Sequence, residues 1–197
     1  MTSPLTARDR AKAERSDAIL RAAAHLFADR GYNGVSLEDI GAAVGVSGPA
    51  VYRHFAGKQA LLGAVLVAVS EDLVDGGRRV SESASGPEER MRALVDFHVD
   101  FALGHADVIR VHDRDVAHLS PDDHAEVRRF QRAYIELWID TLSALIDASP
   151  EELRLRVQAC FGLINSTPHS TRAAARRHSA TAAVLATMAE SALRATT

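Results

Sequence analysis

The sequence predicts an all-α protein with a small N-terminal domain followed by a larger helical domain. Apolar residues recur at intervals of three and four through most of the chain, which is typical of amphipathic helices. No alternating apolar and polar pattern longer than a few residues indicates a strand. The 197 residues, 47% of them hydrophobic, suffice for one small module and one larger helical domain. We expect the boundary between residues 60 and 61.

The N-terminal residues 1–15 form a basic segment ahead of the first predicted helix. Its cations are Arg8, Arg10, Lys12 and Arg15. Such an arm either enters a DNA minor groove or remains a solvated tail. Residues 1–60 carry eight Lys or Arg against six Asp or Glu, whereas the rest of the chain carries 15 against 20. Positive charge is therefore concentrated in the N-terminal domain, and the acidic remainder is not expected to contact nucleic acid.

A short helix is predicted between residues 36 and 45. Ser36 can cap its first turn, and Gly45 can end it because glycine adopts a left-handed conformation at little cost. Its apolar stripe consists of Leu37, Ile40 and Val44.

A second short helix is predicted after the glycine turn. Ser47 is expected to cap it, and Pro49 lies in its first turn, where the missing N–H removes no hydrogen bond. Val51 and Phe55, four residues apart, would form its buried face. The positions expected largely on the outside are Gly48, Pro49, Ala50, Tyr52, Arg53 and His54. This pair of helices predicts a helix-turn-helix.

The outer positions suit a DNA major groove. Gly48 and Ala50 would let the backbone approach the bases, and Pro49 offers carbon surface to a thymine methyl group. Arg53 could bind a guanine or a phosphate instead. Tyr52 is alternatively a half-buried core ring, and Lys58 alternatively a solvated charge. The predicted DNA-contacting residues are Ser36, Ser47, Gly48, Pro49, Ala50, Tyr52, Arg53, His54 and Lys58.

The first 65 residues or so resemble the TetR family of bacterial transcriptional regulators. That family has a glycine turn, a serine-led recognition helix and then Tyr-x-His-Phe-x-x-Lys. In this sequence these residues are Gly45, Ser47, Tyr52, His54, Phe55 and Lys58. The preceding segment, Ala24 to Tyr32, carries the family's Ala-x-Leu-Phe-x-x-x-Gly-Tyr. The resemblance implies a DNA-binding regulator, and Gly48 with Pro49 departs from its commonest pattern, a longer polar pair.

The C-terminal region reads as helix almost throughout. A long helix from Lys58 is expected to break near Gly76 and Gly77, before a linker that ends at Pro87. Pro87, Pro121 and Pro150 suit first-turn positions of further helices. Additional helical segments are expected at residues 108–119 and 180–195.

The last two major helices have the composition of a pairing surface. Their candidate interface residues are Val157, Cys160, Phe161, Ile164, Val184, Leu185 and Met188. In TetR-like proteins the two C-terminal helices of each subunit form a four-helix dimer bundle, so the resemblance implies a homodimer. A two-fold dimer would bind a near-palindromic operator. The alternative is that both helices cover the core of their own subunit.

The middle helices are expected to hold a sensor for a small molecule. An apolar pocket with a few polar groups would favour a hydrophobic effector, and Arg110 and Arg114 could meet an acidic group, as in a fatty acid or acyl-thioester. The candidate effector-binding residues are Phe97, Phe101, Arg110, Phe130, Tyr134, Trp138, Phe161 and Asn165. Each aromatic residue could instead be plain core. We expect a repressor that the effector releases from DNA, although the sequence also allows an activator.

The histidine spacing and the enzyme motifs bear on three other classes of function: metal- or pH-responsive regulators, interaction modules and enzymes. His98, His105 and His112 recur every seven residues, which raises a metal- or pH-responsive alternative, but no tight ligand pair supports a metal, and solvated surface histidines are the expectation. A helical interaction module without DNA binding is the third alternative. No GxSxG, glycine-rich phosphate loop, CxxC or HExxH occurs, so we expect neither an enzyme nor a cofactor.

The single cysteine and the length of the apolar runs indicate in which cellular compartment the protein is expected. Cys160 lies in an apolar stripe, so we expect it to be buried, and one cysteine allows no internal disulfide. The longest apolar run, residues 61–69, is too short to span a bilayer, and the N-terminus lacks a signal-peptide core. We therefore expect a cytoplasmic protein without a membrane partner.

Overall fold

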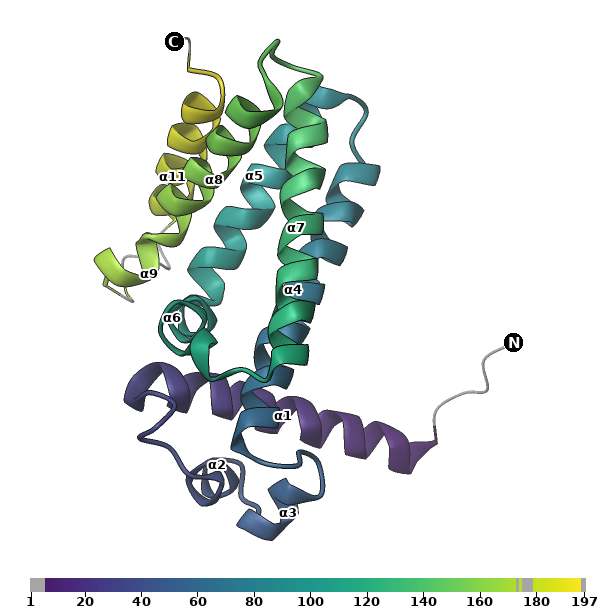
Figure 1. The fold of residues 1–197 in the computed structure, drawn as a ribbon, viewed down its shortest axis with the longest axis vertical. Coiled ribbons are helices and arrows are strands. Elements are labelled where there is room, and N and C mark those ends of the chain that lie inside the picture. Colours follow the sequence, from purple (N-terminus) through teal and green to yellow (C-terminus); the bar gives the residue numbers. More distant parts are fainter. Residues whose placement is uncertain (1–5, 173, 175–178, 196–197) are drawn as a thin grey trace.

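The computed structural model describes residues 6–172, 174 and 179–195, and every regular element within these residues is helical (Figure 1). The all-α prediction is confirmed. The elements are α1 (Ala7–Arg30), α2 (Leu37–Ala43), α3 (Gly48–Tyr52), α4 (Lys58–Glu82), α5 (Pro87–Gly104), α6 (Ala106–Asp115), a 3-10 turn (Val116–His118), α7 (Pro121–Ser143), α8 (Pro150–Asn165), α9 (Thr167–Ser170) and α11 (Ser179–Leu193).

The N-terminal domain consists of α1 lying across α2 and α3, with the start of α4 completing it (Figure 1). Ile19 and Phe27 of α1 pack against Ile40 of α2 and Val51 of α3, and all four are fully buried. Gly45, with φ +70°, turns the chain between α2 and α3, as predicted. α3 lies at the far end of the molecule from α8 and α11.

Helix α1 begins earlier than predicted. Thr6 and Asp9 form a capping box, in which the Thr6 hydroxyl accepts the Asp9 N–H (3.2 Å) and the Asp9 carboxylate accepts the Thr6 N–H (3.3 Å). The predicted arm of residues 1–15 is therefore helical from Ala7 onward, and its cations lie on exposed turns of α1. Residues 1–5 of that predicted arm lie outside the described residues.

Helix α4 continues through Gly76 and Gly77, so the predicted break is wrong. A Cβ at Gly76 would overlap the ring of Phe97, and one at Gly77 would lie 2.6 Å from Cε2 of Tyr134. The two glycines thus let aromatic rings of α5 and α7 pack directly on the α4 backbone. That packing offsets the low helix propensity of glycine.

Helix α4 connects two hydrophobic clusters. Leu61, Leu62, Val65 and Leu66 pack in the N-terminal cluster, whereas Val74 packs in the cluster formed by α5, α7, α8 and α11. Helix α4 starts close to the boundary expected at residue 60, but its first two turns belong to the packing of the N-terminal domain.

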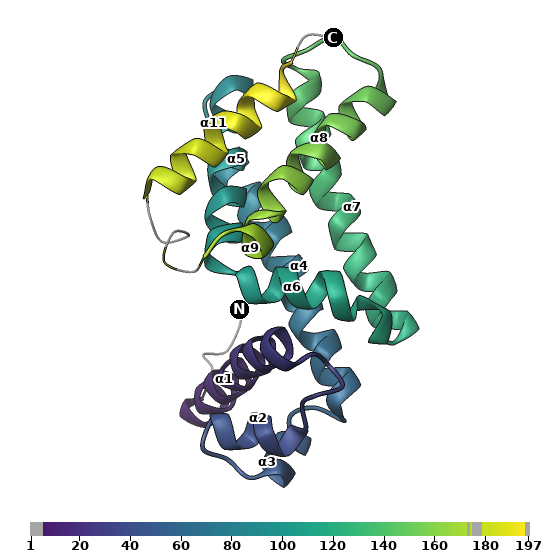
Figure 2. The same cartoon turned by 90° about the vertical axis from the view of Figure 1, so that its left-hand side faces the viewer.

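The C-terminal helices surround α5. Pro87, Pro121 and Pro150 are the first residues of α5, α7 and α8, as predicted. Figure 2 shows α6 lying crosswise between α1 and the long C-terminal helices. No helix among the described residues is long and apolar enough to cross a membrane.

Candidate functional site

The exposed face of α3 is formed by three side chains. Pro49, Tyr52 and Arg53 are exposed, and Tyr52 retains 55% of its surface, which excludes the alternative of a half-buried ring. His54 is partly exposed, with its ring 6.4 Å from that of Phe55. An aromatic phenol and a guanidinium are thus available to a partner at the tip of the domain.

Gly48 and Ala50 do not lie on this outer face, contrary to the prediction. Both are buried, and a Cβ at Gly48 would lie 3.0 Å from Oε1 of Glu38 on α2. Their small size brings α3 close to α2.

The two predicted serine caps differ. Ser36 caps α2, where its hydroxyl accepts the Asp39 N–H (3.1 Å) and donates to the Asp39 carboxylate (2.6 Å). These bonds hold the pKa of Asp39 below its ordinary value. Ser47 makes no side-chain cap bond and is exposed, so its predicted capping role is not realised.

Lys58 is engaged inside the protein. Its ammonium donates to the carbonyl oxygens of Tyr32 and Val35, both at 2.9 Å, and lies 4.5 Å from the centroid of the Tyr32 ring. It therefore ties the start of α4 to the loop between α1 and α2, where it was predicted to contact DNA. The signal that sequence reading lacked is the pair of loop carbonyls, because their direction depends on the fold.

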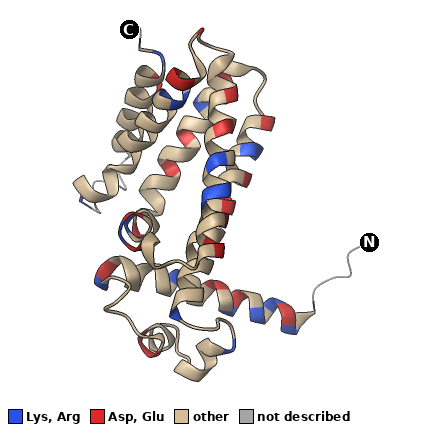
Figure 3. Cartoon of the chain, in the orientation of Figure 1, with Lys and Arg blue, Asp and Glu red and all other residues tan. Residues whose placement is uncertain are grey.

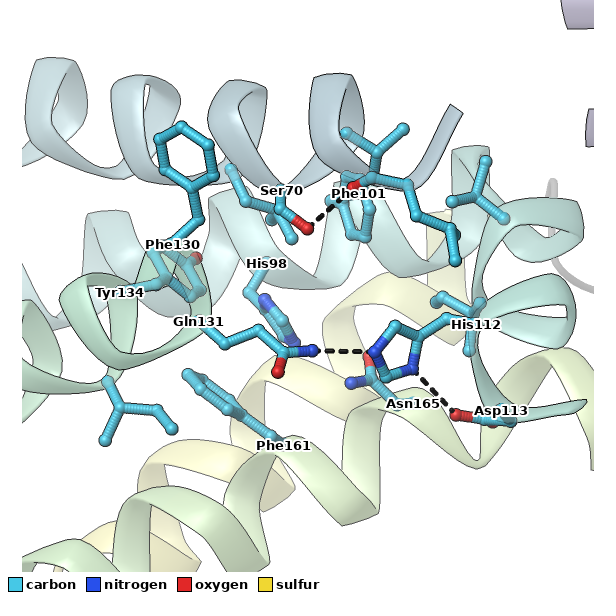
Figure 4. A pocket seen from close by; sticks show the side chains of 16 residues that line it. Ser70, His98, Phe101, His112, Asp113, Phe130, Gln131, Tyr134, Phe161 and Asn165 are labelled. Carbon is cyan, nitrogen blue, oxygen red and sulfur yellow. Dashed lines mark hydrogen bonds and ion pairs between the residues drawn. The ribbon is translucent and has the colours of Figure 1, made fainter. Parts of the chain in front are cut away.

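A cavity of about 300 Å³ lies between α4, α5, α6, α7 and α8 (Figure 4). Phe130 and Tyr134 lie at one end and His112 and Asp113 at the other, with His98 and Phe161 between them. The predicted residues that line it are Phe101, Phe130, Tyr134, Phe161 and Asn165. Sequence reading missed Ser70, Gln131 and Asp113, because polar residues at helix surfaces carry no signal of facing a cavity.

Three predicted effector contacts do not line this cavity. Phe97 packs on Gly76, and the guanidinium of Arg110 donates to the Pro168 carbonyl oxygen at 2.6 Å. Trp138 is fully buried behind the wall, edge-on to the ring of Phe161 at 4.9 Å. Each has a structural role that its residue type alone did not indicate.

Several buried polar atoms at the cavity have no hydrogen-bond partner within the described residues. They are both ring nitrogens of His98, the Tyr134 hydroxyl and Oδ1 of Asn165. An unpaired buried polar group costs about 1–3 kcal/mol. Buried polar groups in proteins are normally paired with protein, water or a ligand, so these atoms can accept a ligand's polar group.

His98 is the centre of an aromatic cluster. Its ring stacks on Phe161 at 4.5 Å and lies 5.7 Å from the ring of Tyr134. It is 3% exposed, contrary to the expected surface position. Burial lowers the pKa of His98 to about 4, and the neighbouring Asn165 side chain opposes this shift in part. Burial also raises the pKa of the Tyr134 hydroxyl, so both groups are neutral at physiological pH.

The three periodic histidines do not converge on one site. His98 and His112 face the cavity, whereas His105 lies at the turn between α5 and α6, stacked on Phe101 at 4.7 Å. His112 instead accepts from the Gln131 amide at 2.7 Å and lies 3.5 Å from the Asp113 carboxylate. Within the described part of the chain, no group of three or more His, Cys, Asp or Glu could hold a metal ion.

The predicted pairing surface separates into two faces. Val157, Cys160 and Ile164 are fully buried in the core of this chain, and Phe161 lines the cavity, so these residues follow the alternative that α8 covers its own subunit. Burial raises the pKa of the Cys160 thiol to about 12. The large apolar side chains that remain exposed on α8 and α11 are Leu155, Val184 and Met188. Figure 3 shows few charged residues along most of these two helices.

Helix α6 contacts both the cavity and the N-terminal domain. Its residues Val108 and Ile109 line the cavity. Its Arg114 donates to the carbonyl oxygens of Phe27 and Ala28 at the end of α1, and pairs with buried Asp115 at 3.0 Å. Helix α6 therefore connects the wall of the cavity to the end of α1.

Known proteins match this chain along most of its length. Residues 19–65 match the family model for bacterial regulatory proteins of the tetR family, and residues 84–169 match a tetracyclin repressor-like C-terminal domain. The HTH-type transcriptional activator FasR of Mycolicibacterium smegmatis is 31% identical over 159 residues, which cover 81% of this chain and 71% of that protein.

Solved structures share the fold. A TetR-family regulator from Bordetella parapertussis has a TM-score of 0.80 at 24% identity, covering 92% of this chain and 94% of its own. AibR in complex with isovaleryl coenzyme A and operator DNA has a TM-score of 0.74 at 21% identity, covering 89% and 96%. With the helix-turn-helix geometry, these matches lead to one conclusion: the chain belongs to the TetR family of bacterial DNA-binding transcriptional regulators.

Proposed function

We propose that the protein is a homodimeric repressor that a small hydrophobic effector releases from a near-palindromic operator. The observation that carries the proposal is the double contact of α6, whose residues line the cavity while Arg114 anchors on the end of α1. If two positions of α6 differ in DNA affinity, a ligand that binds more tightly to one of them changes the DNA affinity of the protein. DNA binding then changes the ligand affinity by the same factor. Fatty acids and acyl-thioesters are the first classes to consider, because AibR is described with an acyl-thioester. Acting on DNA, the protein would work in the bacterial cytoplasm.

The DNA-binding surface is proposed to centre on Tyr52 and Arg53, which project from α3. An operator can be selected from random DNA with the wild-type protein, and its affinity measured by fluorescence anisotropy. Arg53→Ala should weaken binding about tenfold to a hundredfold, since a base or phosphate contact contributes about 1–3 kcal/mol. Arg129→Ala, at an exposed position of α7, is the matched control. Equal affinity of the two variants would contradict the assignment.

The homodimer is proposed to form through the exposed apolar faces of α8 and α11. Met188→Asp would place a charge in that contact and should shift sedimentation toward the monomer. Ala125→Asp adds the same charge to an exposed position of α7 and should leave the assembly unchanged. A dimer that persists in Met188→Asp would exclude this surface.

The coupling is proposed to run through Arg114. In Arg114→Ala the cavity should still bind an effector, but binding should change operator affinity less than it does in the wild type. Arg110→Ala is the matched control, because Arg110 lies on the same helix and donates to Pro168 instead of α1. Reporter transcription from a promoter that overlaps the operator then decides between repression and activation.

A further inference from the structure

The wall of the cavity contains no cation. Among the described residues that line it, none is Lys or Arg, and the single carboxylate is that of Asp113. That carboxylate already lies 3.5 Å from Nδ1 of His112 and 2.9 Å from Nε2 of His169. Arg110 and Arg114, on the same helix as Asp113, donate to carbonyl oxygens elsewhere. Arg129, next to Phe130 in the sequence, lies over the Phe130 ring at 4.2 Å and pairs with Glu126 at an exposed position. A buried anion would find no counter-charge here.

The same wall presents unpaired polar atoms that can both donate and accept hydrogen bonds. A neutral imidazole at His98 offers one donor and one acceptor, Tyr134 offers a hydroxyl, and Asn165 offers its side-chain carbonyl oxygen as an acceptor. These side chains come from different helices, α5, α7 and α8. His98 and Tyr134 stack on the ring of Phe161, and Asn165 lies four residues after Phe161 on α8. Figure 4 shows these groups around one pocket, together with the rings of Phe101, Phe130 and Phe161.

The ionisation of these groups supports the same conclusion. Burial lowers the pKa of His98 to about 4, so the imidazole carries no positive charge for an anion at neutral pH. The raised pKa of Tyr134 keeps its hydroxyl a neutral donor over the same range.

We propose that the cavity selects an uncharged apolar molecule that carries a carbonyl or hydroxyl group, and discriminates against the free carboxylate. The polar group of this molecule would complete the hydrogen bonds of His98, Tyr134 and Asn165, and its apolar body would lie against Phe101, Phe130 and Phe161. The inference rests on the proposed function for one point only, namely that the cavity binds an effector. It narrows the part of the effector that enters the cavity to an ester, thioester, ketone or alcohol on an apolar body, and it removes free fatty acids from the classes considered above.

Matched probes test the charge preference directly. Octanoate, methyl octanoate, octan-1-ol and octylamine share an alkyl body and differ in the polar group, and benzoate with methyl benzoate gives an aromatic pair. The fluorescence of Trp138, the single tryptophan, reports binding because its indole packs edge-on against Phe161. At neutral pH a neutral probe should bind at least about tenfold more tightly than its charged partner. Equal or tighter binding of the carboxylate or the amine, or no binding of any probe, overturns the proposal.

Substitution of Tyr134 separates a binding role from a structural one. Tyr134→Phe removes the unpaired hydroxyl, so the ligand-free protein should lose no stability, while the affinity for the preferred neutral probe should fall about tenfold. Tyr32→Phe is the matched control, because it makes the same change in the loop between α1 and α2, outside the lining of the cavity. Unchanged affinity in Tyr134→Phe would remove this hydroxyl from the site. Loss of stability would show that the hydroxyl is paired in the free protein.

Operator binding provides an independent readout. If neutral probes bind preferentially but leave operator affinity unchanged, the ligand class stands and the proposed repressor mechanism fails. If a carboxylate binds best and releases the operator, the mechanism stands and the ligand class fails.

Discussion

The N-terminal domain and the cavity differ in how their polar groups are satisfied. In the N-terminal domain, Lys58 donates to two carbonyl oxygens, Ser36 and Asp39 bond to each other, and Arg114 reaches in to the end of α1. In the cavity, His98, Tyr134 and Asn165 carry buried atoms without partners in the described protein. The first region is completed by its own contacts, as suits a rigid body that must fit DNA. The second is incomplete, as suits the ligand-binding role that we propose for it.

The largest expected effect concerns pH and His98. In the unfolded chain the imidazole takes up a proton at its ordinary pKa of 6.5, whereas the folded protein keeps it neutral down to about 4. Protons therefore favour the unfolded state between these values, and stability that is present above pH 6.5 is lost as the pH falls toward 4. This group alone should contribute about 3 kcal/mol over that window.

Urea denaturation across this pH range measures the effect. His98→Phe should flatten the pH dependence relative to the wild type, whereas His105→Phe, at an exposed position, should not. Parallel curves for the wild type and His98→Phe would mean that His98 is not a neutral buried group, and the contrast between the two regions would weaken.

A smaller effect is expected at Lys58 in the N-terminal domain. Lys58→Met leaves the carbonyl oxygens of Tyr32 and Val35 without their donor and should destabilise the protein by about 2 kcal/mol. Lys12→Met, the other lysine and an exposed one, should cost little.

The salt dependence of operator binding shows whether Lys58 also contacts DNA. Because its ammonium is engaged internally, we expect Lys58→Met to keep the wild-type slope of log affinity against log salt. A slope reduced by about one would indicate a lost phosphate contact.

The smallest effect distinguishes the two serines at the helix starts. Ser36→Ala removes the cap of α2 and should cost about 1 kcal/mol in thermal or urea unfolding. Ser47→Ala should stay within about 0.5 kcal/mol, because the Ser47 hydroxyl makes no cap bond in α3. Equal losses in the two variants would indicate a second cap that the structure does not contain.

Most of the fold could be predicted from local signals. The prolines that begin α5, α7 and α8, and the glycine turn at Gly45, act within a few residues of themselves, so their effects are visible in the sequence. The start of α1 was missed although Thr6 and Asp9 have capping-box spacing. Among the candidate site residues, those predicted to line the cavity as aromatic groups mostly do so. Those chosen for charge, such as Arg110 and Lys58, make internal contacts instead.

The sequence by itself determined the all-helical fold, the helix-turn-helix and the family, because helix periodicity, caps and a dense motif are local properties of the chain. Only the tertiary structure decided that α4 passes unbroken through Gly76 and Gly77, since the rings that replace their side chains come from α5 and α7. It also decided that His98 is buried and unpaired, and that Val157 and Cys160 belong to the core. Periodicity shows that a helix has an apolar face. Which neighbour covers that face depends on how the helices assemble.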